Sequence, residues 1–321
     1  MSDPANWRPG AGLEQLRARA RLLRMLRDFF EAREVLEVQT PLLCASGVTD
    51  PAIEPLVVAC GSSLSAPRYL QSSPEYAMKR LLAAGSGAVY QIVQAFRDGE
   101  SGSRHNPEFT LLEWYRPGFD HHRLMDEVAE LVRHCLGERP RQDCSYREVF
   151  LELLGLDPFT AADARVEALA RKHVEVGKLA GERDMWLDLL MSHVIEPQLA
   201  DRGMVFVYDY PASQAALSRI VEVDGAQVGQ RFELYVDGVE LANGYCELGD
   251  AVQQRRRFAR DNQRRRAAGQ VERPIDEYLL AALAHGLPDC SGVALGVDRL
   301  LQLATGCADI RQVLTFDWER A

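Results

Sequence analysis

The stretch from Phe96 to Tyr115, FRDGESGSRHNPEFTLLEWY, places charged residues where a β-hairpin normally carries apolar ones. Apolar runs on both sides of a polar loop predict two strands joined by a long turn. Arg97 and Glu113 lie inside the predicted strands rather than at the tip. Burial of a charge costs free energy unless a partner is present, so these positions indicate a ligand that carries charges of its own. An ordinary hairpin with a solvated tip is the simpler interpretation.

A second candidate is the pair of glutamates Glu240 and Glu247, in the segment VELANGYCEL. A spacing of seven would point the two side chains to opposite faces of a regular strand. Asn243 and Gly244 lie between them and predict a bulge or kink, which could bring the carboxylates together. Paired carboxylates at the end of a hairpin suit magnesium carried on a nucleotide. Two exposed glutamates on a strand are the simpler interpretation.

Two helix starts could also contact a ligand. Residues 291–300, SGVALGVDRL, predict a glycine-bearing apolar strand that enters a helix, with Arg299 in the first turn. An arginine in that position is free to bind a phosphate, although such strand-to-helix turns are mostly structural. In Ser73-Pro74-Glu75, the serine suits a helix N-cap and the proline suits the first turn. A functional role here would require Glu75 to face an amine on a ligand.

The elements around these segments predict an α+β fold, a mainly antiparallel sheet flanked by helices, because long hairpins alternate with helices instead of forming βαβ units. We expect residues 1–321 to form a single domain, with a helical insertion at about 137–203 after which the strands resume. The expected helices outside the insertion are 13–33, 73–85, 120–136, 250–268, 275–285 and 297–304. Further expected strands are 205–210, 232–236, 239–247, 292–296 and 313–316, with the Asp237-Gly238 pair as a tight turn.

Composition narrows the class of protein. Hydrophobic residues make up 47% of the 321, which supports a substantial core. The net charge of −10 argues against bulk attraction to nucleic acid. The seven cysteines are scattered and never spaced as CxxC, which favours a reducing cytoplasm over a disulfide framework or structural zinc. We expect neither a signal peptide nor a membrane-spanning segment.

Two arginine triplets, residues 255–257 and 264–266, fall on one predicted helix. A solvated helix face is the simpler interpretation of such a charge run. The alternative is a basic surface that docks an acidic partner protein, since a local arginine face is unusual in an acidic chain.

The order of an apolar helix leading to VQTPLL, then FRDGE with RHNPEFT, then GVALGVDRL resembles the three motifs of class II aminoacyl-tRNA synthetases. Within that class, SPEYAMKRLL, RHNPEFTLLEWY and ELANGYCEL most resemble lysyl-tRNA synthetase, and the resemblance covers about residues 13–318. Roughly a dozen residues precede the first helix, so we expect no anticodon-binding OB-fold barrel. This shortened form resembles the bacterial lysyl-tRNA synthetase paralogues, which activate (R)-β-lysine with ATP and attach it to a lysine of elongation factor P.

The resemblance implies a role for each motif residue. Those implied for ATP are Arg97, Asp98, Gly99, Glu100, Asn106, Phe109, Glu240, Leu241, Gly296 and Arg299. Those implied for the amino acid are Ser73, Pro74, Glu75, Tyr115, Glu247 and Ala294. Arg97, Glu240 and Arg299 would act in catalysis, and Glu240 and Glu247 would bind Mg²⁺. A homodimer through the first-motif helix and Pro41 is implied as well.

Two positions depart from the lysyl-tRNA synthetase pattern. Ala294 stands where those enzymes carry glycine, and its methyl group would narrow the amino-acid pocket in favour of an isomer with a displaced amine. The usual Phe-Arg-x-Glu has one extra residue here, which leaves open whether Asp98, Gly99 or Glu100 meets the adenine.

Two other functions remain open at this stage. One is an enzyme that charges tRNA with lysine through the acceptor stem alone. The other is a non-catalytic paralogue that senses amino acids, although such proteins usually lose the ATP-binding arginines that this chain retains.

Overall fold

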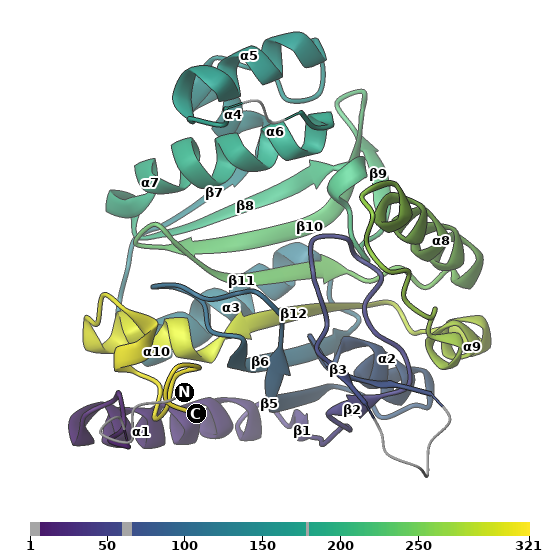
Figure 1. The fold of residues 1–321 in the computed structure, drawn as a ribbon. Helices are drawn as coiled ribbons and strands as arrows, with labels where there is room; N and C mark the ends of the chain where they lie inside the picture. The colour runs from purple at the N-terminus through teal and green to yellow at the C-terminus, as the bar shows by residue number, and fades with distance from the viewer. Residues whose placement is uncertain (1–6, 60–65, 178–179) are drawn as a thin grey trace.

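The computed structural model describes residues 7–59, 66–177 and 180–321, which fold around one mixed, mostly antiparallel sheet (Figure 1). In order across the sheet, its strands are β1 (Leu36–Glu37), β5 (Val89–Phe96), β6 (Glu108–Pro117), β12 (Cys290–Gly296), β11 (Val239–Cys246), β10 (Ala226–Val236), β8 (Met204–Pro211) and β7 (Arg141–Ser145), and β9 (Ile220–Val223) pairs with β10. Only the β1–β5 and β7–β8 pairs are parallel. The α+β prediction is confirmed.

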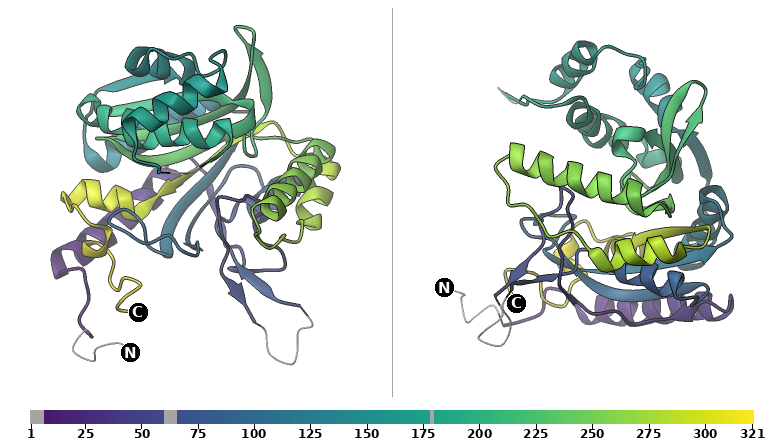
Figure 2. Two further views of the ribbon diagram at one scale, coloured as in Figure 1. Left: turned by 45° about the horizontal axis from the view of Figure 1, so that its top comes forward. Right: turned by 90° about the vertical axis from the view of Figure 1, so that its right-hand side faces the viewer.

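Helices α1 (Leu13–Glu31), α3 (His121–Leu136) and α10 (Val297–Thr305) share one hydrophobic core with the central strands. The apolar stripe of α1 predicted this burial: Leu22, Leu26, Phe29 and Phe30 are buried. Most arginines of α1 are exposed, but Arg19 is partly buried and pairs with the buried Asp298. On another side of the sheet, α2 (Glu75–Ala83) and α8 (Ala251–Ala267) both pack against α9 (Glu277–Gly286), as Figure 2 shows.

The segment expected as a helical insertion contains α4 (Tyr146–Leu154), α5 (Asp163–His173), α6 (Arg183–Leu190), a π-helical turn (Met191–Ile195) and α7 (Glu196–Gln198). These helices build a second core against β8 and β10, at the top of Figure 1. The segment also supplies a strand that the sequence did not indicate. β7, with the polar sequence RQDCS, pairs with β8 at the edge of the sheet.

Two hairpins position most of the candidate residues. β5 and β6 pair from Val89 opposite Tyr115 to Phe96 opposite Glu108, as the charged hairpin predicted. β10 and β11 are joined by Asp237 and Gly238, both with positive φ, which is the tight turn that an Asp-Gly pair favours.

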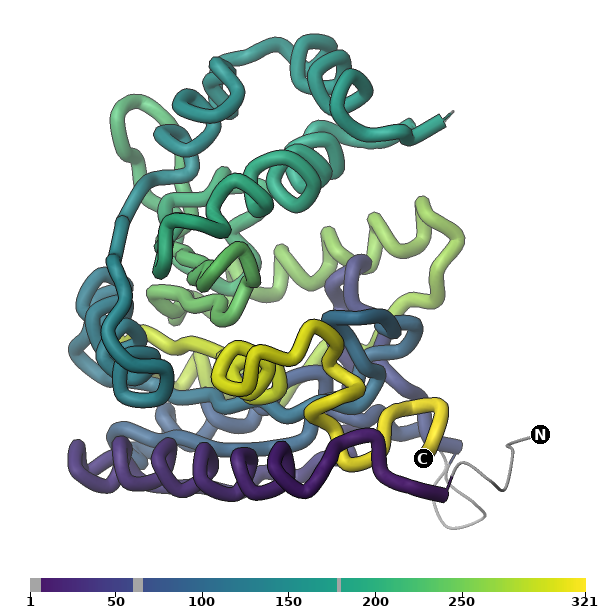
Figure 3. Tube along the Cα trace, turned by 90° about the vertical axis from the view of Figure 1, so that its left-hand side faces the viewer, coloured from purple at the N-terminus to yellow at the C-terminus, as the bar shows by residue number. Residues whose placement is uncertain are grey.

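The predicted final strand at 313–316 is wrong. A 3₁₀ turn (Ile310–Gln312) precedes it, and Val313 and Leu314 are buried against the main core without joining either sheet. Backbone groups of Thr315 and Leu314 instead accept hydrogen bonds from Gly10 and Ala11. The apolar run therefore reflected burial of an irregular segment. The tube in Figure 3 shows the course of this segment near the C-terminus.

A small second sheet contains β2 (Leu43–Cys44), β4 (Arg68–Leu70) and β3 (Val57–Val58). Among the helices that the structure describes, none is long and apolar enough to cross a membrane.

Candidate active site

One cavity of about 1390 Å³ opens between the two hairpins, α2, β12, α6 and α8. It brings together nearly all of the residues singled out in the sequence. Those that line it are Ser73, Pro74, Glu75, Arg97, Glu100, Asn106, Phe109, Tyr115, Glu240, Leu241, Glu247, Ala294, Gly296 and Arg299. Asp98 and Gly99 do not line it.

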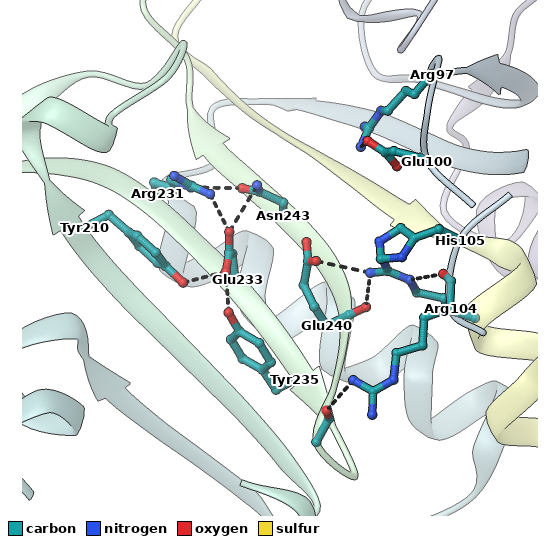
Figure 4. Close-up of polar contacts among 12 residues, drawn as sticks. Arg97, Glu100, Arg104, His105, Tyr210, Arg231, Glu233, Tyr235, Glu240 and Asn243 are labelled. Carbon is teal, nitrogen blue, oxygen red and sulfur yellow. Dashed lines mark hydrogen bonds and ion pairs between the residues drawn. The ribbon is translucent and has the colours of Figure 1, made fainter. Parts of the chain in front are cut away.

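The three candidates for contact with adenine, Asp98, Gly99 and Glu100, take different positions in the β5–β6 loop. Asp98 and Gly99 are exposed, and Gly99 has the positive φ of a turn. Glu100 faces the cavity and lies 3.6 Å from the Arg97 guanidinium (Figure 4), which in turn lies over the Phe109 ring. The geometry therefore favours Glu100 as the side chain available to a bound base.

Asn106 has a structural role within the same loop. Its amide donates to the backbone carbonyl of Glu108, and its carbonyl oxygen accepts from the backbone of Trp318. It lines the cavity while it ties the loop to the C-terminal segment.

Arg299 is held at one end of the cavity by contacts from two segments, β11 and the β5–β6 loop. It donates to the backbone carbonyl of Glu240 at 2.7 Å, to the Glu240 carboxylate at 3.1 Å and to His105 Nε2 at 2.8 Å. Burial and the charge of Arg299 lower the pKa of His105, which keeps the ring neutral and able to accept. The preceding Asp298 is buried and accepts from the backbone of Thr110, which fixes the start of α10.

A β-bulge turns Glu240 toward the cavity. Leu234 and Tyr235 of β10 pair with Ala242 and Glu240, which leaves Leu241 as an extra residue in β11. One extra residue reverses the alternation, so Glu240 and Glu247 face the same side. The expected bulge was placed two residues too far along the strand, where the ladder is regular.

Glu240 and Glu247 take different partners in the structure. Glu240 pairs with Arg299, whereas Glu247 pairs with Lys79. A magnesium ion shared by these two side chains stays a prediction.

The carboxylate beside Glu240 is Glu233, on the neighbouring strand β10 (Figure 4). Glu233 is buried and accepts from Tyr210 at 2.7 Å and Tyr235 at 2.5 Å, and it pairs with Arg231. It was not expected from the sequence. The sequence feature that could have revealed Glu233 is a charged residue between the apolar residues Phe232 and Leu234, in the strand segment FELYV.

A third acidic group, Glu196 of α7, faces the same region. Burial and the charges of Glu240 and Glu233 raise the pKa of Glu196 to about 8. Among the described residues no three metal-ligating side chains already form a cage. Burial is the larger cause of this raised pKa, and the charges of Glu240 and Glu233 add to it; neighbouring carboxylates of this kind suit a hard cation with oxygen ligands.

The opposite end of the cavity holds a second acidic group. Glu113 is buried and accepts from Ser73 Oγ at 2.8 Å and from the Tyr115 hydroxyl at 2.7 Å. Burial and the charge of Glu75 raise the pKa of Glu113 to about 8. Ser73 also accepts from the backbone of Glu75, although the helix begins one residue later than predicted, with Pro74 rather than Ser73 as its N-cap. Glu113 thus belongs to the site, as its place inside a strand suggested.

Lys79 was missed entirely. It lies one helical turn after Glu75 in α2 and contacts both Glu75 and Glu247. The only feature of the sequence that pointed to Lys79 was its i, i+4 spacing from Glu75. Lys79 also follows Met78, which is buried.

β12 forms the floor between the two ends. Ala294 pairs with Glu113 on one side and Asn243 on the other, and its methyl group borders the cavity. Two residues earlier, Gly292 lies so close to Tyr115 that a Cβ atom would meet the ring at 2.2 Å.

The arginine triplets of α8 are used inside the molecule. Arg265 is fully buried and pairs with Glu54, and Arg257 donates to the carbonyls of Ala216 and Ser218. Three others pair with acidic side chains: Arg255 with Glu277, Arg264 with Glu182, and Arg266 with Glu272. These contacts favour the structural interpretation over a basic docking face.

Comparison with known proteins supports this picture. Residues 7–320 match the family described as tRNA synthetases class II (D, K and N). The elongation factor P–(R)-β-lysine ligase of Edwardsiella ictaluri (strain 93-146) is 47% identical over 327 residues, covering all of both chains. Proteins of the same name from Pseudoalteromonas translucida (strain TAC 125) and Salmonella typhi are 47% and 46% identical, over 98% and 100% of both chains.

Proposed function

The chain belongs to the class II tRNA synthetase family (D, K and N), and from this premise we propose that it is an ATP-dependent ligase that joins (R)-β-lysine to elongation factor P. The acceptor is the ε-amine of a lysine on that protein. The observation that carries the proposal is the buried acidic group at one end of the cavity, facing arginines at the other. Carboxylates suit the two amines of β-lysine, and arginines suit phosphate.

ATP use follows from the family, and the arginine end of the cavity supports ATP binding there. Arg97 binds the α-phosphate and Arg299 the γ-phosphate, while Glu100 and Phe109 contact the adenine. Although burial opposes it, the charges of Arg299 and Arg97 hold the pKa of Glu240 below its ordinary value, so this carboxylate is ionised at neutral pH.

The reaction needs no base in its first step, because the amino-acid carboxylate is already ionised. Its oxygen attacks the α-phosphorus of ATP, and the bond to pyrophosphate breaks. The ε-amine of the acceptor lysine then attacks the activated carbonyl carbon, AMP leaves and the amine loses a proton. The protein contributes by holding the reactants in line and by neutralising the charge that develops on phosphate.

Mg²⁺ is the expected companion of the nucleotide, and the carboxylates Glu240 and Glu233 fit it better than the pair first inferred from sequence. Both lie near Glu196 and raise its pKa, so their charges converge on one region. When bound there, Mg²⁺ would shield the phosphate charge. Glu247 lies instead with the acidic residues at the other end of the cavity, where the amino acid binds.

The mass of elongation factor P, measured after incubation with this protein, ATP and each lysine isomer, tests the function directly. We expect an added β-lysyl group with (R)-β-lysine, and little with α-lysine. Charging of tRNA with radiolabelled lysine in a parallel reaction would favour the tRNA-acylating alternative. If the folded protein gave neither product, both functions would be contradicted.

We expect β-lysine binding to strengthen as pH rises through about 8. Glu113 has a raised pKa, so it is mostly protonated at pH 7 and gains its charge above pH 8. An ammonium group on the ligand binds the ionised form better, so KM for β-lysine should fall across this range. ATP–pyrophosphate exchange at several pH values measures KM. In Glu113→Gln this fall should vanish; its persistence there would assign the titration to another group.

Ala294→Gly should relax the choice of amino acid toward α-lysine. The methyl group of Ala294 borders the cavity opposite Glu113, in the space that an α-amino group would use. A methyl-sized difference is worth roughly 1 to 3 kcal/mol in discrimination, so we expect a shift of tens of fold. The ratio of exchange rates with the two isomers, in wild type and variant, gives the answer. An unchanged ratio would place selectivity in contacts of Glu75 and Tyr115.

A homodimer in the cytoplasm completes the proposal. The region around β1 and the small sheet exposes a set of large apolar side chains: Leu36, Leu42, Leu43 and Val57. Exposed apolar residues gathered in one region are typical of a protein interface. Sedimentation velocity would distinguish a dimer from a monomer.

A further inference from the structure

Lys79 is almost completely enclosed, with 1% of its surface exposed. Its Nζ lies 2.6 Å from Glu75 Oε1 and 2.5 Å from Glu247 Oε2. Burial alone would lower its pKa, but the charges of Glu247 and Glu75 raise it above the ordinary value, so the side chain is an ammonium. The second partner comes from the end of β11, far along the chain from α2.

This arrangement differs from an ordinary helical ion pair. Pairs at i, i+4 normally lie in water and contribute little to stability. A buried pair must recover a large desolvation cost, which makes it a poor device for stability alone. Lys79 is also isolated from the solvent side of the cavity by the carboxylates that it contacts, so it acts through them.

The carboxylates around Lys79 outnumber it. Glu75, Glu113 and Glu247 all lie at this end, so three acidic groups surround one ammonium. Glu247 is 1% exposed, yet its Oε1 has no hydrogen-bond partner among the residues that the structure describes. A buried acceptor without a donor is costly unless a ligand supplies one.

Resting on the proposed function, we infer that Lys79 is an internal counter-ion of the amino-acid pocket. Its ammonium fixes Glu75 and Glu247 in position and leaves this acidic group able to accept from both ammonium groups of a diamino acid. Lys79 is thus a positioning residue: it determines how the pocket presents its acceptors without touching the substrate.

Lys79→Met tests this inference, because methionine retains most of the buried volume and loses the charge. Without the ammonium, Glu75 and Glu247 repel each other and lose their fixed orientation. We expect KM for β-lysine in ATP–pyrophosphate exchange to rise roughly tenfold to a hundredfold. KM for ATP should stay within about twofold of wild type, because the arginine end is untouched.

Arg80→Met is the matched control. It removes one positive charge from the next position of α2, where the exposed guanidinium lies over the Tyr278 ring. Its KM for β-lysine should stay near that of wild type. An unchanged or lower KM in Lys79→Met would overturn the inference, as would an equal rise in Arg80→Met.

A second variant separates charge from packing and guards against a poorly folded methionine variant. In Lys79→Ala, added propylammonium should partly restore the KM for β-lysine, whereas 1-propanol of similar size should not. Equal rescue by both would show that only volume matters, and rescue by neither would show that the charge has no separate role. If the wild-type protein showed no β-lysine-dependent exchange, that result would instead contradict the proposed function itself.

Discussion

Replacing Arg299 by alanine should abolish measurable adenylate formation while leaving the fold intact. The guanidinium is held by Glu240 and His105 at the phosphate end of the cavity, and its neighbour Asp298 independently fixes the start of α10. A charge-assisted contact made in the transition state is worth on the order of 3 kcal/mol, which is more than a hundredfold in rate. ATP–pyrophosphate exchange dependent on β-lysine is the measurement.

Arg311→Ala provides the control for loss of an arginine. Arg311 is exposed and pairs only with the nearby Asp309, so exchange should remain near the wild-type rate. Circular dichroism should give the same spectrum for both variants and wild type. Near wild-type exchange by folded Arg299→Ala would remove this residue from the phosphate site.

Gly292→Ala should disable the amino-acid end of the cavity. A Cβ atom at this position would lie 2.2 Å from a ring carbon of Tyr115 and 2.6 Å from Glu247 Oε1. Both side chains are buried, so neither can move aside without disturbing the acidic group. Overpacking of this kind costs about 1 to 3 kcal/mol of stability. We expect a lower melting temperature together with loss of β-lysine-dependent exchange.

Gly249→Ala is a suitable comparison for that change. Its nearest contacts would be Leu287 atoms at 3.8 Å, an ordinary van der Waals distance, and its φ is not positive. Melting temperature and exchange should both stay close to wild type. If Gly292→Ala behaved in the same way, Tyr115 would have more room to move than its burial indicates.

Sequence patterns predicted the frame of this site because its signals are local. The apolar runs around residues 96–115 specified β5 and β6, and Asp237-Gly238 specified the β10–β11 turn. A charge inside a strand, at Glu113, indicated a polar ligand site, and the structure places that residue in the lining of the cavity. Period and turn chemistry depend on neighbours in sequence, so they can be inferred without the fold.

Contacts across the sheet could not be inferred in this way. Glu233, the carboxylate beside Glu240, lies on another strand, and the bulge at Leu241 depends on how β10 and β11 align. Lys79 meets Glu247 only because α2 packs beside the end of β11. The polar strand β7 has no pattern of its own and exists through pairing with β8. Each of these features is set by tertiary packing, which overrides local preference.

The extra residue at Leu241 also bears on how such a site can diverge. β11 is hydrogen-bonded along both edges, to β10 and β12, so it cannot gain or lose a residue without breaking two ladders. Deletion of one residue at the bulge would turn Glu240 toward the core, whereas substitutions at either end leave the register alone. A lineage could therefore change its amino-acid substrate through substitutions at the Glu247 end, while the nucleotide-binding end stays unaltered.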